Sequence, residues 1–414
     1  MQSKKQPNLP IAPPTLHAIN LAQTALVPME REFLPFHTPE IGDDEIQSVV
    51  ETLRSGWLTT GPKVKQLEED FATYIGCQHA VAVSSGTASL HLALEAIGIK
   101  EGDEVLVPTM TFAATAAVVI HLKARPVLVD CCQHTFNMDP DQIERAITPR
   151  TKAILPVHIA GQPCDMGRIL EIAKHYNLRV IEDAAHALPA RYLDKMIGTI
   201  GDITCFSFYA TKTITTGEGG MATTENPEWA DRMRIMSLHG ISKDAWKRYT
   251  SEGSWYYEIL SPGYKYNLTD IGAALGINQL NKCSQFWRAR NRIAKLYDNA
   301  FSNLAEIRTP WCGPDVQHAW HLYVIQLQLD RLRITRNEFI NELKDKNIGT
   351  SVHFIPLHLH PYYRDTFGYK PQDFPIASAV FQRTISLPIY PKMTEEDVRY
   401  VIDAVTNIVR KYQR

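Results

Sequence analysis

From Phe33 to about residue 312, short runs rich in β-branched residues alternate with stretches of helical period. About one helix separates each run from the next. The predicted strands are His79–Ser84, Glu104–Pro108, Arg125–Asp130, Lys152–His158, Leu178–Asp183 and Ile203–Phe208. Repeated βα units of this kind indicate an α/β fold built around a largely parallel sheet.

The helical period is clearest after the first predicted strand, where Leu90, Ala93, Leu94 and Ile97 recur on one face. The small residues of the segment 83–89 (VSSGTAS) lead directly into this helix. A turn of small residues at a helix N-terminus exposes free N–H groups that can bind an anion. The alternative is an ordinary helix cap without a ligand.

The pattern changes beyond about residue 312. Trp320–Leu329 alternates like a strand, Asn337–Lys346 has a helical period, and Thr350–Phe354 is typical of a short strand. Thr394–Lys411 is an amphipathic closing helix with a threonine cap and acidic residues in its first turn. We therefore predict an N-terminal extension over residues 1–32, a large α/β domain over 33–312 and a smaller α+β domain over 313–414.

Composition narrows the possible functions. The 414 residues carry a net charge of −2 and a pI of about 6.7, which disfavours binding to nucleic acid through bulk charge. The longest nearly uncharged apolar stretch, Thr111–Leu122, is far shorter than the ~20 residues of a membrane span. The first residues lack the apolar core of a secretory signal, so we expect a cytoplasmic protein with no membrane partner.

Several common cofactor motifs are missing. The sequence has no G-x-G-x-x-G after its first strand, no G-x-x-x-x-G-K-[ST], and no His/Cys cluster at zinc-like spacing. We therefore predict no metal site. The motifs that would indicate a nicotinamide dehydrogenase or a P-loop protein are absent, so the sequence disfavours both classes.

An acid and a lysine follow two successive predicted strands. The segment 180–186 (VIEDAAH) ends a strand in Glu182 and Asp183, and the next strand leads into Lys212, which a glycine-rich turn follows. Ligands of open α/β sheets gather outside the carboxyl ends of strands. Taken singly, such a carboxylate is most often solvated and such a lysine is most often a surface charge. Here the lysine comes one strand after the acid and beside a glycine-rich turn, and both interpretations stay open.

These motifs, taken in order, resemble a known family. SGTASLHLAL, TFAATAA, PVHIAGQPCDM, VIEDAAHA, SFYATKTITTGEGG, GYKYNLTDIGAALG and SVHFIPLHLHPYY are similar to segments of the DegT/StrS-type nucleotide-sugar aminotransferases. Members of that family use pyridoxal 5′-phosphate (PLP) on the aspartate aminotransferase fold, fold type I. The resemblance runs from about Phe36 to the C-terminus and implies a homodimer with shared active sites.

The resemblance assigns roles to individual residues. It implies that Lys212 binds PLP covalently and that Asp183 pairs with the pyridine nitrogen, which a carboxylate keeps protonated so that the ring can accept electrons. Phe112 would lie against the ring and His186 beside its phenolic oxygen. The phosphate contacts implied in the same way are Gly86, Thr87 and Ser207. For Phe112 the alternative to a cofactor contact is packing in the hydrophobic core. For Ser207 the alternative is a buried hydroxyl that forms a hydrogen bond with the backbone.

One loop differs from many relatives. They carry Gly-Tyr-Asn-Tyr-Arg where this chain has Gly-Tyr-Lys-Tyr-Asn at 263–267, a loop that in the family reaches the cofactor phosphate of the neighbouring subunit. We carry over Asn267 as a cofactor contact and Lys265 as a substrate contact. This version, with the segments 239–240 and 244–246 upstream, resembles the subgroup that aminates UDP-linked 4-keto sugars of the 4-amino-4-deoxy-L-arabinose type.

Four further residues resemble substrate contacts of the family. Trp57 and Thr60 lie in a segment that borders the sugar site, and His353 and His358 lie in the segment that approaches the nucleotide. The alternative for each histidine is a structural or exposed side chain.

The predicted activity is transfer of the amino group of L-glutamate to C4 of a nucleotide-linked 4-keto sugar, with Lys212 as both cofactor anchor and general base. A sugar dehydrase of the same fold is one alternative, although such relatives have histidine in place of this lysine. A non-catalytic PLP-binding regulator is another.

Overall fold

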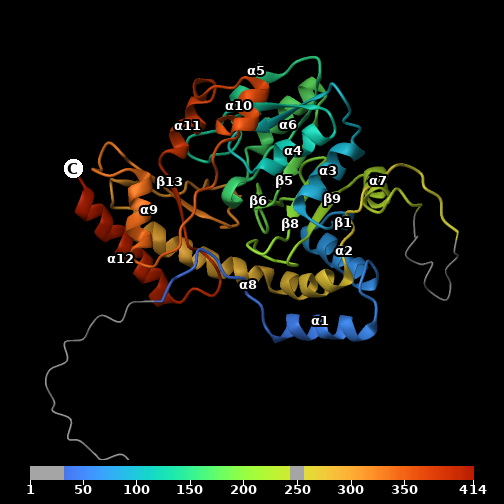
Figure 1. The fold of residues 1–414 in the computed structure, drawn as a ribbon, viewed down its shortest axis with the longest axis horizontal. Coiled ribbons are helices and arrows are strands. Elements are labelled where there is room, and N and C mark those ends of the chain that lie inside the picture. The colour runs from blue at the N-terminus through green and yellow to red at the C-terminus, as the bar shows by residue number, and fades with distance from the viewer. Residues whose placement is uncertain (1–31, 243–255) are drawn as a thin grey trace, which may run out of the picture. The chain divides into compact units, whose positions relative to one another are not determined.

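The computed structural model describes residues 32–242 and 256–414 (Figure 1). The predicted N-terminal extension, except for its last residue Glu32, lies outside the described residues, as does the segment 244–246.

A seven-stranded sheet forms the centre of the fold. Its strands, in spatial order, are β1 (His79–Val83), β9 (Gly220–Thr224), β8 (Ile203–Ser207), β5 (Arg179–Asp183), β4 (Thr151–Ile154), β2 (Glu104–Pro108) and β3 (Arg125–Val129). The five strands from β8 to β3 are mutually parallel, and only β9 runs antiparallel to its two neighbours. The predicted α/β class with a mostly parallel sheet is therefore confirmed.

The six predicted strands are all present: β2 has the predicted bounds, and β1, β3, β5 and β8 are each one residue shorter at one end. The strand expected to reach His158 ends at Ile154, two residues before Pro156, which has no N–H to donate to a ladder. Strand β9 was not predicted, because it begins directly at Gly220, the last residue of the glycine-rich turn.

Helices cover both faces of this sheet. Val105 and Val107 pack with α3 (Gly86–Ala96), α4 (Ala113–His121) and α7 (Pro227–Ser237), whereas Leu106 packs with α5 (Pro140–Ala146) and α6 (Met166–Tyr176). Successive strand residues point to opposite faces, so a sheet buried on both sides is apolar at nearly every position. Each fully buried side chain of this size contributes roughly 1.5–3 kcal/mol.

The 32-residue helix α8 (Asp270–Phe301) joins the two halves of the structure. Its first half packs with α2 (Pro62–Ile75) against the large sheet, and its second half packs in the core of the C-terminal region. Figure 1 shows α1 (Asp43–Ser55) lying alongside it. At the junction, the buried Arg290 donates hydrogen bonds to the carbonyl oxygens of Trp320, His321 and Ile389, at 3.3, 3.2 and 2.6 Å.

The C-terminal region contains an antiparallel sheet of β10 (Ile307–Arg308), β12 (Tyr323–Leu327) and β13 (Thr384–Leu387). Helices α9 (Arg336–Lys344) and α12 (Glu395–Tyr412) pack on it, and Thr394 caps α12 as predicted. The prediction of a strand over Thr350–Phe354 is wrong, since only Ser351 forms a single bridge, with Ser386.

Residues 357–381 return to the large sheet. They contain α10 (Pro361–Phe367), α11 (Pro375–Phe381) and the short 3₁₀ turns Leu357–Leu359 and Pro371–Asp373, and their apolar side chains join the core of α3 and α4. Asp130 fixes this return, because its carboxylate accepts hydrogen bonds from the N–H groups of Ile376 and Ala377, at 3.0 and 2.9 Å. The predicted domain boundary near residue 312 stays a prediction.

The remaining elements are small. The short strands β6 (Arg191–Tyr192), β7 (Lys195–Met196) and β11 (Val316–Gln317) form a third, three-stranded sheet. Residues Ile159–Gly161 form a 3₁₀ turn. Among residues 32–242 and 256–414, no helix has both the length and the apolar character needed to cross a membrane.

Candidate active site

A cavity of about 590 Å³ opens at the carboxyl ends of β5 and β8, beside the N-terminus of α3. It brings together eight of the residues singled out in the sequence. They are Gly86, Thr87, Phe112, Asp183, His186, Ser207, Lys212 and His353. The position agrees with the rule that ligands of parallel sheets bind outside the carboxyl ends of their strands.

Lys212 lies in the turn that follows β8, where its N–H donates to the carbonyl of Tyr209 at 2.9 Å. Burial of the ammonium group lowers its pKa to about 8, and the negative charge of Asp183 opposes that shift. A lysine with this pKa is a neutral amine far more often than an exposed lysine at neutral pH. Lys212 is therefore suited to act as a nucleophile or as a base.

Asp183 is the last residue of β5 and is 5% exposed. Its Oδ2 accepts a hydrogen bond from the Thr115 hydroxyl at 2.9 Å, and its Oδ1 accepts one from the N–H of Ala185 at 3.1 Å. Burial raises the pKa of Asp183, while these two hydrogen bonds and the charge of Lys212 oppose the increase. The carboxylate is thus held in one orientation and has acceptor positions left for a ligand N–H.

The first turn of α3 lines the cavity. Ser85 caps the helix through its hydroxyl, which accepts the N–H of Ala88 at 3.0 Å. Gly86 is required here, since a Cβ at this position would come within 2.9 Å of the Cβ of Ser207. The free N–H groups of this turn and the Ser207 hydroxyl form a concave polar surface suited to a phosphate.

Aromatic and imidazole rings form the side walls. Phe112 is 61% exposed, and its ring centroid lies 5.8 Å from that of Phe354. His186 accepts the N–H of Ala160 at its Nδ1, at 3.2 Å, so its neutral ring carries the proton on Nε2. Burial and the charge of Lys212 keep the pKa of His186 well below its usual range. His353 is likewise neutral, because burial lowers its pKa to about 4, and its Nδ1 lies 2.8 Å from the Ser386 hydroxyl.

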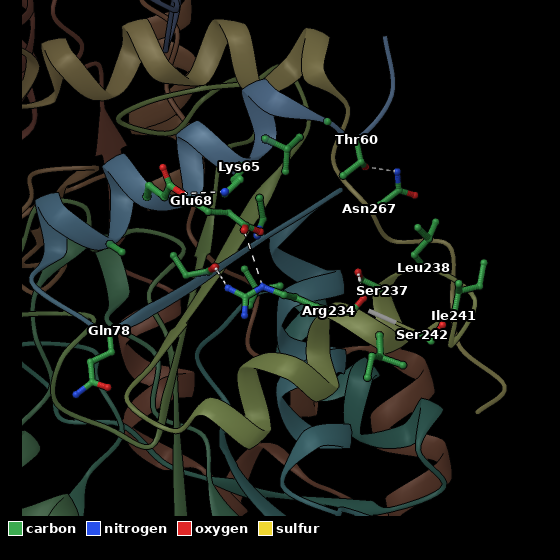
Figure 2. Close-up of a pocket in the computed structure, with 18 residues that line it drawn as sticks. Thr60, Lys65, Glu68, Gln78, Arg234, Ser237, Leu238, Ile241, Ser242 and Asn267 are labelled. Atoms are coloured by element: carbon green, nitrogen blue, oxygen red, sulfur yellow. Dashed lines mark hydrogen bonds and ion pairs between the residues drawn. The ribbon is translucent and has the colours of Figure 1, made fainter. Parts of the chain in front are cut away.

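Four predicted residues lie outside this cavity and form a connected group, which we call the Thr60 cluster: Trp57, Thr60, Lys265 and Asn267. The Asn267 amide donates to the Thr60 hydroxyl at 2.7 Å, and Lys265 donates to the Asn267 carbonyl oxygen at 2.6 Å. The indole N–H of Trp57 donates to the carbonyl of Thr60 at 3.2 Å. Figure 2 shows Thr60 and Asn267 at one end of a separate cavity of about 360 Å³.

His358 lies in neither cavity. Its side chain is fully buried, with Nδ1 2.7 Å from the Thr109 hydroxyl and Nε2 3.0 Å from the Ser378 hydroxyl. Both ring nitrogens are therefore occupied inside the chain, and the ring packs on Phe374. The expected substrate contact of His358 stays a prediction that this geometry does not favour, and we do not include His358 in the proposed site.

The cavity also contains residues that were not singled out in the sequence: His37, Thr115, Tyr209 and His321. Thr115 contacts Asp183 directly. The one feature of the sequence that could have indicated this contact is the spacing of four residues between Thr111 and Thr115, which places the two hydroxyls one helical turn apart.

The residues present fit PLP. The cavity is lined by the N-terminus of helix α3, an exposed phenyl ring, the buried carboxylate of Asp183 and the half-buried side chain of Lys212. A phosphate, an aromatic heterocycle, a ring nitrogen and an aldehyde each find a complementary group among Gly86, Phe112, Asp183 and Lys212.

Solved structures place this fold among the PLP-dependent aminotransferases. "Putative sugar aminotransferase Spr1654" from Streptococcus pneumoniae, in its PMP-form, matches with a TM-score of 0.86 at 38% identity, covering 91% of this chain and 99% of that chain. Its PLP-form matches with a TM-score of 0.85 at 37% identity, covering 92% and 99%. PseC of Helicobacter pylori, an aminotransferase involved in the biosynthesis of pseudoaminic acid, matches with a TM-score of 0.85 at 26% identity, covering 92% and 100%.

The sequence comparison is more specific. The chain matches the DegT/DnrJ/EryC1/StrS aminotransferase family over residues 39–406 and belongs to that family. It is 54% identical over 386 residues to the spore coat polysaccharide biosynthesis protein SpsC of Bacillus subtilis, covering 93% of this chain and 99% of that protein. The protein is thus a PLP-dependent transaminase, as the sequence motifs predict.

Proposed function

We propose that the protein transfers the amino group of L-glutamate to C4 of a nucleotide-linked 4-keto sugar, with UDP as the nucleotide. The product would serve amino-sugar biosynthesis for a cell-surface polysaccharide or lipopolysaccharide. The names of SpsC, Spr1654 and PseC support a sugar acceptor and a polysaccharide pathway. We further infer a cytoplasmic homodimer.

The observation that carries the chemistry is that the half-buried Lys212 and the buried Asp183 line one cavity, where desolvation lowers the pKa of the lysine and raises that of the acid. When bound, PLP supplies an electron sink for the negative charge that develops on the α-carbon of the donor. Asp183 holds a proton on the pyridine nitrogen, which keeps that sink effective. Lys212 would hold the aldehyde carbon of PLP and, with its amine free, would act as the base that takes the proton from the α-carbon of the donor.

The other cavity residues bind and orient. The N–H groups of Gly86 and Thr87 and the Ser207 hydroxyl hold the phosphate, and Phe112 restricts the ring to one plane. His186 donates its Nε2 proton near the phenolic oxygen. His353 lies at the same cavity in the C-terminal region and offers a neutral imidazole to the sugar.

Two half-reactions test this proposal separately. The PLP-loaded enzyme is first mixed with L-glutamate, L-aspartate or L-alanine, and the loss of the PLP absorbance band is followed in single turnover. The pyridoxamine phosphate form is then offered UDP-, dTDP- and GDP-4-keto sugars, and the return of the band is recorded. We expect the fastest loss with L-glutamate and the fastest return with a UDP-linked sugar. Lys212→Ala is the control and should carry out neither half-reaction.

Three outcomes would contradict the proposal in different ways. Steady turnover by Lys212→Ala would remove the central role of that lysine. Sugar dehydration without consumption of glutamate would indicate the dehydrase alternative. Failure of every amino donor to change the spectrum of wild-type protein would favour a non-catalytic regulator.

A further inference from the structure

Two threonine hydroxyls form a chain behind the carboxylate of Asp183. The Thr115 hydroxyl lies 2.9 Å from Asp183 Oδ2, and the Thr111 hydroxyl lies 2.8 Å from that of Thr115. Thr111 is 2% exposed and Thr115 is 1% exposed, so water does not compete for these bonds. Both residues line the cofactor cavity.

The direction of the two hydrogen bonds follows from the available protons. An ionised carboxylate can only accept, so the single hydroxyl proton of Thr115 points at Asp183. Thr111 must then donate to the oxygen of Thr115. Hydrogen bonds aligned in this way polarise one another, and the bond that reaches the carboxylate is strengthened.

The same short segment also carries Phe112. Thr111, Phe112 and Thr115 lie at the N-terminal end of α4, with Phe112 as the residue that precedes its first turn. One helix terminus therefore presents the aromatic wall and fixes the carboxylate. A shift of α4 would move the ring contact and the partner of the ring nitrogen together.

We propose that Thr115, supported by Thr111, is a positioning residue that keeps the Asp183 carboxylate ionised and directed at the pyridine nitrogen of the cofactor. Oδ1 is fixed by the N–H of Ala185, so Thr115 supplies the second point that sets the plane of the carboxylate. The inference rests on PLP as the cofactor but not on the identity of the amino donor or the sugar.

Paired substitutions separate the hydroxyl from packing. Thr115→Val keeps the shape of the side chain and loses the donor, whereas Thr115→Ser keeps the donor and loses a methyl group. If the hydroxyl positions Asp183, Val is impaired and Ser is close to wild type. If Thr115 only fills space, Val is close to wild type and Ser is impaired. Thr115→Ala is a second variant without the donor, and alanine suits a helix should Val disturb folding.

The first readout needs neither substrate. Each variant is loaded with PLP labelled with ¹⁵N in the ring, and the ¹⁵N chemical shift reports protonation of the pyridine nitrogen. We expect Thr115→Val and Thr115→Ala to move this shift toward that of an unprotonated pyridine, and Thr115→Ser to keep the wild-type value. Thr111→Val should move it in the same direction by a smaller amount, since the bond to Asp183 remains.

Kinetics supply the second readout. If the full contribution of a hydrogen bond to a charged group is lost from the transition state, the rate falls by about 10- to 100-fold. We expect this fall in kcat for Thr115→Val in the donor half-reaction, with KM little changed, because the bond acts on the cofactor and not on the substrate. A wild-type ¹⁵N shift and wild-type kcat in Thr115→Val would overturn the inference, even if the proposed donor and acceptor proved correct. Conversely, failure of glutamate as donor would leave the ¹⁵N result intact.

Discussion

At the scale of single residues, burial acts on the two central groups in opposite directions. It lowers the pKa of Lys212 to about 8 and raises the pKa of Asp183, because in each case the charged form loses hydration. The attraction between the two charges opposes both shifts. Asp183 has two further hydrogen bonds that favour its ionised form, whereas no such bond is described for the Lys212 amine. The site therefore holds a lysine that gives up its proton readily, beside a carboxyl group whose upward pKa shift is restrained by two hydrogen bonds and by the charge of Lys212.

This balance predicts the pH dependence of Lys212 in protein freed of PLP. A pKa of about 8 leaves roughly a tenth of the amine neutral at pH 7, against less than a thousandth for an ordinary lysine near pKa 10.4. Because only the neutral amine reacts with an acylating reagent, Lys212 should label with an inflection near pH 8. Pulsed acetylation and peptide mass spectrometry measure this profile. Asp183→Asn removes the opposing charge and should move the inflection to lower pH; an inflection near 10 in wild type would contradict the assignment.

The sequence is sufficient to place these two residues but not all of their partners. Asp183 and Lys212 each follow an apolar strand, and the ends of neighbouring parallel strands meet at one edge of a sheet. Thr115 contacts Asp183 across 68 positions of sequence, and His321 reaches the cavity from the C-terminal region. Long-range contacts bring them there, among them the hydrogen bond from the N–H of Leu322 to the carbonyl of Ala160 at 3.1 Å. Periodicity reports which face a residue lies on and not which residue it meets.

At the scale of elements, the edge of the large sheet is protected by side chains. β1 is an edge strand, and its outward N–H at Ala82 donates to Glu68 Oε1 at 2.8 Å. The carbonyl of Ala80 accepts from Arg234 at 2.9 Å, and the two side chains lie 3.9 Å apart (Figure 2). An unpaired edge can pair with another chain, so this pair of side chains blocks such pairing.

Removing the acid should destabilise the fold. Glu68→Ala leaves the Ala82 N–H without its partner, which costs about 1–3 kcal/mol of unfolding free energy in urea titrations. The matched control is Glu69→Ala, one residue along α2, whose carboxylate is two-thirds exposed and meets Lys65 at 3.6 Å. An exposed i,i+4 pair is worth only about 0.3–0.5 kcal/mol. Equal effects of the two substitutions would contradict the edge role of Glu68.

The same carboxylate adds a pH signature. Burial raises the pKa of Glu68 from 4.5 to about 7, and the charge of Arg234 only partly opposes this. Between pH 4.5 and pH 7 the carboxyl group of Glu68 is protonated in the folded state and ionised in the unfolded state. Protonation of Glu68 therefore adds to the free energy of unfolding at pH 4.5, and this addition is lost as the pH rises through 7. Glu68→Gln keeps an acceptor for Ala82 and should lack this pH dependence relative to wild type.

Secondary structure was predicted well where burial imposes a clear period. The strands of the large sheet and the closing helix α12 are buried runs or amphipathic stretches with capping residues. Strand β9 begins on a glycine, and its position between β1 and β8 is set by long-range pairing. Thr350–Phe354 has the composition of a strand but meets only one partner residue. In both segments tertiary context decides the structure.

At the scale of the whole molecule, the predicted ligand contacts fall into two groups: residues that line the cavity, and residues of the Thr60 cluster that do not. Gly86, Asp183 and Lys212 line the cavity of their own chain, whereas Asn267 and Lys265 do not. The latter two are linked to Thr60 through hydrogen bonds of 2.7 and 2.6 Å on another part of the surface. If this cluster binds cofactor or substrate, the cavity that it completes is that of a second copy of the chain. The predicted homodimer with shared sites thus has a direct test.

Mixed dimers provide that test. Lys212→Ala and the double variant Lys265→Ala/Asn267→Ala should each have little activity alone. When the two are reassorted, the site that combines Lys212 of one chain with the Thr60 cluster of the other is intact in every hybrid. Half of the dimers are hybrids with one working site of two, so turnover should recover to about a quarter of wild type. Had each chain formed its site alone, every site in the hybrid would carry a defect and no activity would return.

Mixing Lys212→Ala with Asp183→Ala is the matched control, because both residues line the same cavity and no combination of those chains restores a complete site.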